Sequence, residues 1–268
     1  MQLILYSVAF AAAAIALLGA GLWFLWWKRN TAVYRKELPR VFELHDLIQN
    51  PRPPNAYFRD FDKSLAEVPQ KLKQFRDIES ELDGLDPAAW DDLKTEAADQ
   101  LAARDGKRGW QSLFDILNHA KAYNYVRRIG CTNIAFIPRA RAKGQMTPDL
   151  KAELGSVNVL CEVKTINMSG DEATRRQIGG VGTSTDCLEP GFFNKMTSDL
   201  TRAKAQMLSY GTDSAAKMIA YVIINFDDSL HEYADRYEVQ INQYMASTPV
   251  PGLEVAFDIK PAFYTAMA

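Results

Sequence analysis

Hydrophobic residues recur along the chain at different spacings, and each spacing predicts a different kind of element. In the segment 192–209, apolar side chains return every three or four residues, which is the period of an amphipathic helix. In the segment 157–165, the side chains alternate in a strand-like pattern. The run 218–224 is apolar on both alternating faces, which is typical of a central strand with helices on each side.

Other segments with the same spacings precede and follow these three. The tight connection 153–156 predicts that the strands on either side of it form a hairpin. The order of the elements predicts an α/β sandwich with a mixed sheet. The predicted elements are a helix at 110–129, strands at 132–137, 146–152 and 157–165, a helix at 192–209, a strand at 218–224, another helix, and a last strand near 253–259.

The amino-terminal segment has a pattern of its own, because residues 3–27 form a run of 25 positions without a charged side chain. As a helix this run would be roughly 37 Å long, enough to span a bilayer. It ends in Trp26 and Trp27 followed by Lys28 and Arg29, so the positive-inside rule predicts a single-pass anchor with the carboxyl-terminal domain in the cytoplasm. A cleaved signal peptide is the alternative, but the run is longer than a usual apolar region and lacks a charged start.

The segment 31–106 has a helical pattern and separates the predicted anchor from the α/β region. Residues 31–49 predict a juxtamembrane helix, and the prolines at 51–54 end it. A further helix is predicted at 65–82 with a possible interruption at Pro69, and Asp86 predicts the N-cap of the next one. The predicted organisation is therefore an anchor at 1–30, a helical region at 31–106 and an α/β domain at 107–268.

Composition excludes several kinds of site. A net charge of −2 gives no global attraction to a polyanion, so any nucleic-acid interface must be local. The three cysteines form no CxxC pair, which argues against a disulfide framework and a zinc knuckle. The three histidines form no HxxxH or HxH pair, which gives little support for a histidine-rich metal site. His119 and Cys161 are interpreted as structural residues. The glycine-rich run 179–184 lacks the lysine of a P-loop, which argues against a nucleotide-binding site.

The predicted hairpin places three chemically active residues together. Because side chains alternate along a strand, Glu162 and Lys164 share one face. If the turn centres on Leu154 and Gly155, paired residue numbers sum to 309, which places Asp149 opposite Leu160 and diagonal to Glu162. An ordinary exposed Glu-Lys pair on a hairpin is the alternative, but it does not explain a carboxylate at the matching diagonal position.

Two carboxylates beside a lysine are suited to a hard cation. Asp149 and Glu162 would repel each other unless a cation lay between them, and oxygen ligands of this kind favour Mg²⁺ or Mn²⁺. The main-chain carbonyl of Val163 is a further candidate ligand. Such a metal can activate a water and stabilise a phosphate under attack, and Lys164 would orient or deprotonate that water or neutralise the phosphate.

These residues resemble a known motif. Thr147-Pro148-Asp149 followed by Glu162-Val163-Lys164 resembles the PD-(D/E)xK motif of restriction-endonuclease-like nucleases, and the similarity extends over roughly residues 108–226. The resemblance implies a three-layer sandwich with a central mixed sheet, magnesium-dependent phosphodiester cleavage, and metal ligation by Asp149 and Glu162. Many members have a glutamate on the helix before the first strand, where this chain offers only Asp115.

Local charge predicts where a nucleic acid would bind. Residues 121–151 contain seven lysines or arginines and one acid, Asp149, and such a cluster attracts backbone phosphates, although a merely solvated basic face is equally compatible with it. The loop before the helix 192–209 adds two arginines, and one stripe of that helix is polar. The candidate contacts are Arg139, Arg141, Lys143, Arg175, Arg176, Lys195, Arg202 and Gln206.

The sequence therefore predicts a membrane-anchored nuclease that acts on DNA. An enzyme that cleaves RNA would share the same metal site. A module of the same fold without catalysis, which binds nucleic acid or protein and recruits a partner through the acidic helical segment 59–105, is the alternative from a different functional class.

Overall fold

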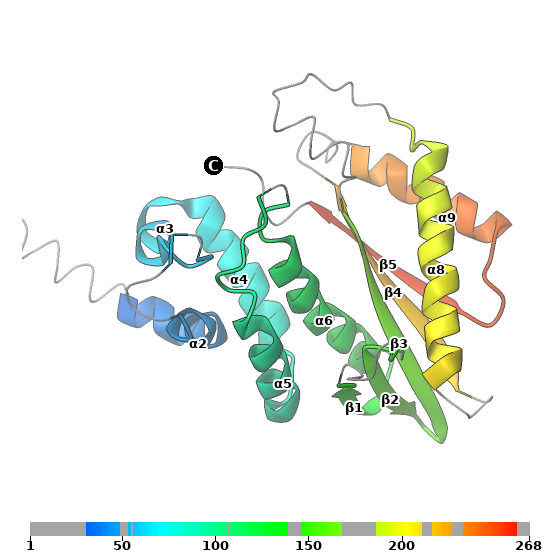
Figure 1. Ribbon diagram of the computed structural model, residues 1–268, viewed down its shortest axis with the longest axis horizontal. Helices are drawn as coiled ribbons and strands as arrows, with labels where there is room; N and C mark the ends of the chain where they lie inside the picture. Colours follow the sequence, from blue (N-terminus) through cyan, green and yellow to red (C-terminus); the bar gives the residue numbers. More distant parts are fainter. Residues whose placement is uncertain are drawn as a thin grey trace, which may run out of the picture. The chain divides into compact units, whose positions relative to one another are not determined.

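The computed structural model describes residues 31–48, 53–54, 56–106, 108–138, 146–167, 186–210, 216–226 and 233–261 (Figure 1). The chain divides into two compact units, one within Met1–Leu47 and Asp60–Glu79, the other within Ile48–Arg59 and Ser80–Ala268. Among the described residues, no helix is both long enough and apolar enough to cross a membrane. The predicted span 3–27 lies outside these residues.

The first unit is helical, and prolines set its boundaries. Residues 31–37 are helical and a new helix begins at Pro39, so the predicted helix 31–49 is in fact divided by a proline. The predicted interruption at Pro69 is confirmed. The carboxylate of Glu79 accepts hydrogen bonds from the N–H groups of Arg40 (3.2 Å) and Val41 (2.9 Å), which caps a helix start. The helices are α2 (Pro39–Asp46), α3 (Phe61–Glu67) and α4 (Pro69–Asp83), whose last residues belong to the second unit.

The second unit contains one five-stranded mixed sheet in the order β1-β2-β3-β4-β5. The pairs β1/β2 and β2/β3 are antiparallel, and β3/β4 and β4/β5 are parallel. The predicted α/β architecture with a mixed sheet is thus confirmed. The elements are α5 (Pro87–Ala98), α6 (Gln111–Arg128), β1 (Thr132–Phe136), β2 (Leu150–Leu154), β3 (Val157–Ile166), α8 (Pro190–Tyr210), β4 (Lys217–Phe226), α9 (Ala234–Ser247) and β5 (Glu254–Pro261).

Helices cover both faces of this sheet, with α6 on one face and α8 and α9 on the other (Figure 1). The strand β4 is buried on both of its faces, as its two-sided apolar pattern predicts. Asp86 is confirmed as the N-cap of α5, because its side chain accepts from the N–H of Ala89 at 2.9 Å. One side of α8 packs on the sheet through apolar residues spaced three or four positions apart. The buried residues of α8 are Met196, Leu200, Ala203 and Met207.

The hairpin between β2 and β3 differs from its prediction in register. Its paired residues, such as Leu154 with Val157 and Leu150 with Cys161, have numbers that sum to 311 rather than 309. The turn therefore consists of Gly155 and Ser156, and Gly155 has a φ of +61°, which a glycine adopts without strain. The predicted strand at 146–152 was also placed too early, since β2 begins at Leu150.

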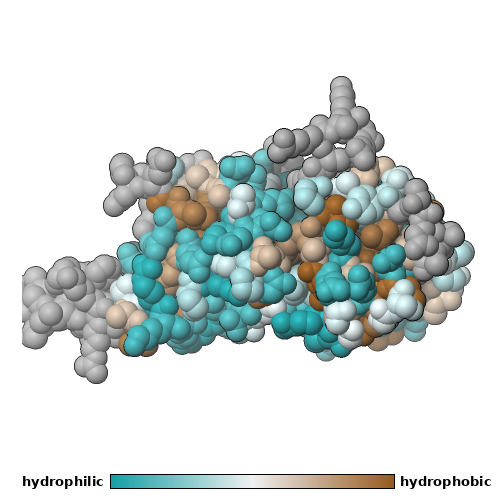
Figure 2. Space-filling view, turned by 90° about the horizontal axis from the view of Figure 1, so that it is seen from below, coloured by the Kyte–Doolittle hydropathy of each residue, from teal (hydrophilic) through white to brown (hydrophobic). Residues whose placement is uncertain are grey.

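Hydrophobic residues are interspersed with hydrophilic ones on the face of the molecule that Figure 2 shows. The large apolar side chains that are exposed come from separate elements, for example Val157 of β3 and Val239 of α9. Scattered exposure of this kind is normal for a globular protein and needs no partner to explain it.

Candidate metal-binding and catalytic site

The main chain of Asp149 is fixed where β2 begins. Its N–H donates to the carbonyl of Cys161 at 3.1 Å, and its own carbonyl accepts from the N–H of Ile137 at 2.9 Å. The residue is therefore held between β1 and β3. Its carboxylate reaches past the end of the β2/β3 ladder, where Oδ2 accepts a hydrogen bond from the N–H of Val163 at 2.7 Å.

The observed register changes how the two predicted carboxylates meet. Leu160 pairs with Lys151, so the predicted position of Asp149 opposite Leu160 is wrong. The last pair of the observed register is Leu150 with Cys161, and the N–H of Asp149, one residue earlier, also donates to the carbonyl of Cys161. Asp149 therefore lies just beyond the last pair of the hairpin, close enough to Glu162 for its negative charge to raise the pKa of that carboxyl.

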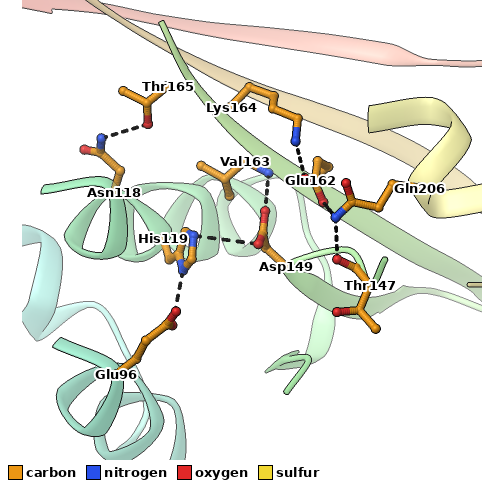
Figure 3. Close-up of polar contacts among 10 residues, drawn as sticks. All are labelled: Glu96, Asn118, His119, Thr147, Asp149, Glu162, Val163, Lys164, Thr165 and Gln206. Carbon is orange, nitrogen blue, oxygen red and sulfur yellow. Dashed lines mark hydrogen bonds and ion pairs between the residues drawn. The ribbon is translucent and has the colours of Figure 1, made fainter. Parts of the chain in front are cut away.

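Glu162 and Lys164 lie on one face of β3, as their spacing predicts, and they form a buried pair. The ammonium Nζ of Lys164 lies 2.5 Å from Oε1 of Glu162, and the side chains are 23% and 3% exposed. The other oxygen of Glu162, Oε2, accepts from Nε2 of Gln206 in α8 at 2.9 Å. Figure 3 shows these side chains and Asp149 gathered beside the start of β2.

The ionised form of the buried Glu162 side chain is disfavoured by its surroundings. The pKa of the Glu162 carboxyl is raised to about 7, firstly by burial and secondly by the negative charge of Asp149, and the nearby ammonium of Lys164 opposes this rise. A carboxyl group that resists ionisation beside another carboxylate is stabilised in its charged form by a bound cation. The pair is therefore a candidate for binding a cation.

His119 belongs to the same site, which its sequence position did not indicate. Its Nε2 lies 3.7 Å from Oδ1 of Asp149, and its Nδ1 lies 3.8 Å from Oε2 of Glu96 in α5 (Figure 3). The interpretation of His119 as a purely structural residue is therefore incomplete. A sequence feature that could have indicated this role is the group of polar residues at 115, 118 and 119 on a helix whose buried residues are mostly apolar.

A second polar cluster lies next to His119 under α6, on the face of the sheet opposite to Glu162 and Lys164. Asn118 donates to Oγ1 of Thr165 at 3.2 Å, Asn167 donates to Oδ1 of Asp115 at 3.3 Å, and Asn225 donates to Asn167 at 2.7 Å. Burial raises the pKa of the Asp115 carboxyl, and its hydrogen bond with Asn167 opposes this effect. Asp115 is thus engaged with the ends of β3 and β4, and the described contacts do not bring it to Asp149.

The oxygen atoms of Asp149, Glu162 and Val163, beside the start of β2, suit a hard cation that keeps some of its bound waters. The N–H and C=O groups of one residue in a strand point to the same side. The N–H of Val163 donates to Asp149, so its carbonyl also points toward Asp149. Within the described part of the chain, no three His, Cys, Asp or Glu side chains form a ready cluster of ligands. Two carboxylates, one carbonyl and water match the way in which Mg²⁺ is usually held, because it keeps several of its waters.

The structure describes three of the eight residues that were predicted to contact nucleic acid. Arg139, Arg141, Lys143, Arg175 and Arg176 lie outside the described residues. Lys195 is exposed and pairs with Asp199 at 2.6 Å, and Arg202 is exposed on the same helix. Gln206 instead faces the site, where it donates to Glu162 and to the carbonyl of Thr147.

Comparison with known proteins adds no relative to this description. No family model, no curated protein and no solved structure matches the chain.

Proposed function

We propose that the chain is a magnesium-dependent nuclease of the restriction-endonuclease-like fold that hydrolyses phosphodiester bonds in DNA. The observation that favours this function is the proximity of Asp149 and Glu162 beside the start of β2, with Lys164 hydrogen-bonded to Glu162 at 2.5 Å. The strand order supports the fold, because an antiparallel β1-β2-β3 sheet is extended by parallel β4 after a crossover helix. Mn²⁺ would serve in place of Mg²⁺ at such an oxygen-rich site.

Each residue of the proposed site has a defined task. Asp149, Glu162 and the carbonyl of Val163 would hold the cation. When bound, a divalent cation lowers the pKa of water and neutralises charge on the phosphate. Lys164 has three N–H donors, and in the described part of the chain one of them is used for Glu162, so the others would orient the attacking water or bind a phosphate oxygen.

Two further residues would keep these groups in place. Gln206 holds the Glu162 carboxylate and the Thr147 carbonyl, so it fixes the segment that precedes Asp149 against α8. The N–H of Val163 holds Oδ2 of Asp149, and the other oxygen, Oδ1, faces the imidazole of His119 at 3.7 Å. Geometry of this kind favours catalysis because the reacting groups are held before substrate arrives.

The proposed location follows from the predicted anchor. The apolar segment 3–27 would tether the enzyme at the cytoplasmic face of a membrane, close to membrane-proximal nucleic acid. Arg139, Arg141 and Lys143 precede the metal-binding strand in the sequence, and we propose that they contact the phosphate backbone of the bound strand.

The test is cleavage of plasmid DNA, single-stranded DNA and RNA by the full-length chain with Mg²⁺, Mn²⁺ or EDTA. We expect metal-dependent cleavage that Asp149→Ala and Lys164→Ala both abolish with folding intact. Lys73→Ala is the matched control, because Lys73 also pairs with a carboxylate, that of Asp77, but lies on an exposed helix face. Absence of cleavage of every substrate with either metal would favour the non-catalytic binding module instead.

A further inference from the structure

The imidazole of His119 lies between two carboxylates from different elements. Its Nε2 is 3.7 Å from Oδ1 of Asp149, and its Nδ1 is 3.8 Å from Oε2 of Glu96 (Figure 3). The His119 side chain is only 11% exposed, so the ring is enclosed rather than free to turn in solvent. This arrangement forms a continuous polar chain from α5, through α6, to the residue proposed to hold the metal.

The helix that provides Glu96 is firmly attached to its neighbour. α5 buries Trp90, Leu93 and Ala97 along one side, which places Glu96 one residue before a buried position. At its amino-terminal end, Oδ2 of Asp86 accepts a hydrogen bond from the hydroxyl of Tyr123 in α6 at 2.7 Å. The carboxylate of Glu96 is therefore presented to His119 by a packed helix and not by a loop.

The two nitrogens of an imidazole are linked, since the partner of one decides the orientation of the ring and the hydrogen-bonding state of the other. A carboxylate behind a histidine is a recurrent device for fixing the ring beside a metal site. Glu96 faces Nδ1 and so sets how Nε2 meets Asp149. The two oxygens of Asp149 thus have different neighbours, since Oδ2 accepts from the N–H of Val163 at 2.7 Å and Oδ1 faces the ring of His119 at 3.7 Å.

We infer that Glu96 is a positioning residue that acts through His119 on the carboxylate of Asp149. The inference rests on the proposed function for the identity of the cation that Asp149 holds. It makes α5, which precedes the α/β region in the sequence, a part of the metal-binding unit. A truncation that removes α5 would accordingly weaken the site even though Asp149, Glu162 and Lys164 remain.

The first test is the affinity of the full-length protein for Mn²⁺, measured by the loss of the free-ion signal in electron paramagnetic resonance. We expect Glu96→Gln and His119→Asn each to weaken binding on the order of 10-fold. Because Glu96 acts through His119, the double variant should bind no more weakly than His119→Asn alone. Asp92→Asn, on an exposed position of the same helix, should leave the affinity unchanged. Wild-type affinity in Glu96→Gln, or additive losses in the double variant, would overturn the inference.

The second test does not depend on metal binding. The chain has three histidines, so the ring nitrogen resonances of His119 are assigned by their loss in His119→Asn. In metal-free protein, Glu96→Gln should shift these resonances, and Asp92→Asn should not. If wild-type protein binds no Mn²⁺ but the resonances shift, the proposed function fails while the contact of Glu96 with His119 stands. Unchanged resonances in a folded Glu96→Gln protein would reject the inference alone.

Discussion

The side-chain amide of Gln206 donates a hydrogen bond of 2.9 Å to Oε2 of Glu162. The same nitrogen lies 2.5 Å from the carbonyl oxygen of Thr147, two residues before Asp149. One residue of α8 thus connects the carboxylate on β3 to the segment that leads into Asp149. The relative position of the two proposed metal ligands depends on this amide as well as on the strands.

Removal of this amide should impair the site without unfolding the protein. Gln206→Ala leaves both acceptors without their donor, and we expect metal affinity and cleavage rate to fall about 10- to 100-fold, the range observed when residues that orient metal ligands are changed. Gln206→Glu should be worse, because it adds a carboxylate beside Glu162. Thr201→Ala, at an exposed position of the same helix, is the control. A fully active Gln206→Ala enzyme would show that the strands alone hold the ligands.

The raised pKa of Glu162 predicts an unusual dependence of stability on pH. Its pKa is about 7 in the folded protein, owing to burial and the charge of Asp149, and 4.5 is the ordinary value. Between these values the folded state holds a proton that the unfolded state has released, so stability is present below pH 4.5 and is lost as pH rises through 7. The part of this loss that falls between pH 5.5 and pH 8 should be on the order of 2 kcal/mol for metal-free protein.

The measurement is urea unfolding in EDTA at pH 5.5 and pH 8. Glu162→Gln lacks the titrating group, so its stability should decline less between these pH values than that of the wild-type protein. Mg²⁺ or Mn²⁺ should restore wild-type stability at pH 8, because a ligand that binds only the folded state stabilises it. The same pH dependence in wild-type protein and Glu162→Gln would contradict the assignment.

The sequence predicted the elements well because their periods are long and regular. The two-sided apolar run of β4 and the helical stripe of α8 both appear where the pattern placed them. The register of the hairpin was harder to predict from the sequence. Moving the centre of the turn by one residue changes every cross-strand pair, but each side chain stays on the same face of the sheet, so the hydrophobic pattern does not distinguish the two registers. The φ of +61° at Gly155 explains the outcome, since it places this glycine at the first position of a two-residue turn.

The site could be predicted only as far as it lies along one hairpin. Glu162 and Lys164 are two residues apart, so the geometry of a strand brings them together. The pairing of His119 with Asp149 joins a helix to a strand thirty residues later, and no local period determines how that helix is rotated over the sheet. The contact of Gln206 with Glu162 depends on packing in the same way, which is why its side chain was expected to contact nucleic acid.

Asp86 should contribute to stability through two separate bonds. Its Oδ1 caps α5 by accepting from the N–H of Ala89, and its Oδ2 accepts from the buried hydroxyl of Tyr123. We expect Asp86→Ala to lower the free energy of unfolding by about 2–3 kcal/mol, from the loss of a cap and of a partner for a buried donor. Tyr123→Phe should remove only the second part, and the exposed Asp92→Asn should change little.

A double-mutant cycle would separate these two parts. If Oδ2 of Asp86 acts only on Tyr123, the cost of Asp86→Ala in a Tyr123→Phe background should fall to the cost of the cap, about 1 kcal/mol. Strictly additive changes in chemical unfolding would mean that the hydroxyl of Tyr123 gains nothing from Asp86. Because α5 also presents Glu96, Asp86→Ala should weaken Mn²⁺ binding to a small extent as well.

Gly155 should matter for the site although it lies at the far end of the hairpin. A side chain at a φ of +61° is strained, so Gly155→Val should destabilise the protein by about 1–3 kcal/mol in chemical unfolding. Ser156→Ala, at the other turn position, should cost much less. The turn also selects the register that sums to 311, and a change to 309 would move Leu150 from opposite Cys161 to opposite Val159 and so displace Asp149, the residue before it, relative to Glu162. Mn²⁺ affinity distinguishes the two effects: strain alone lowers stability and leaves affinity intact, whereas a shifted register lowers both.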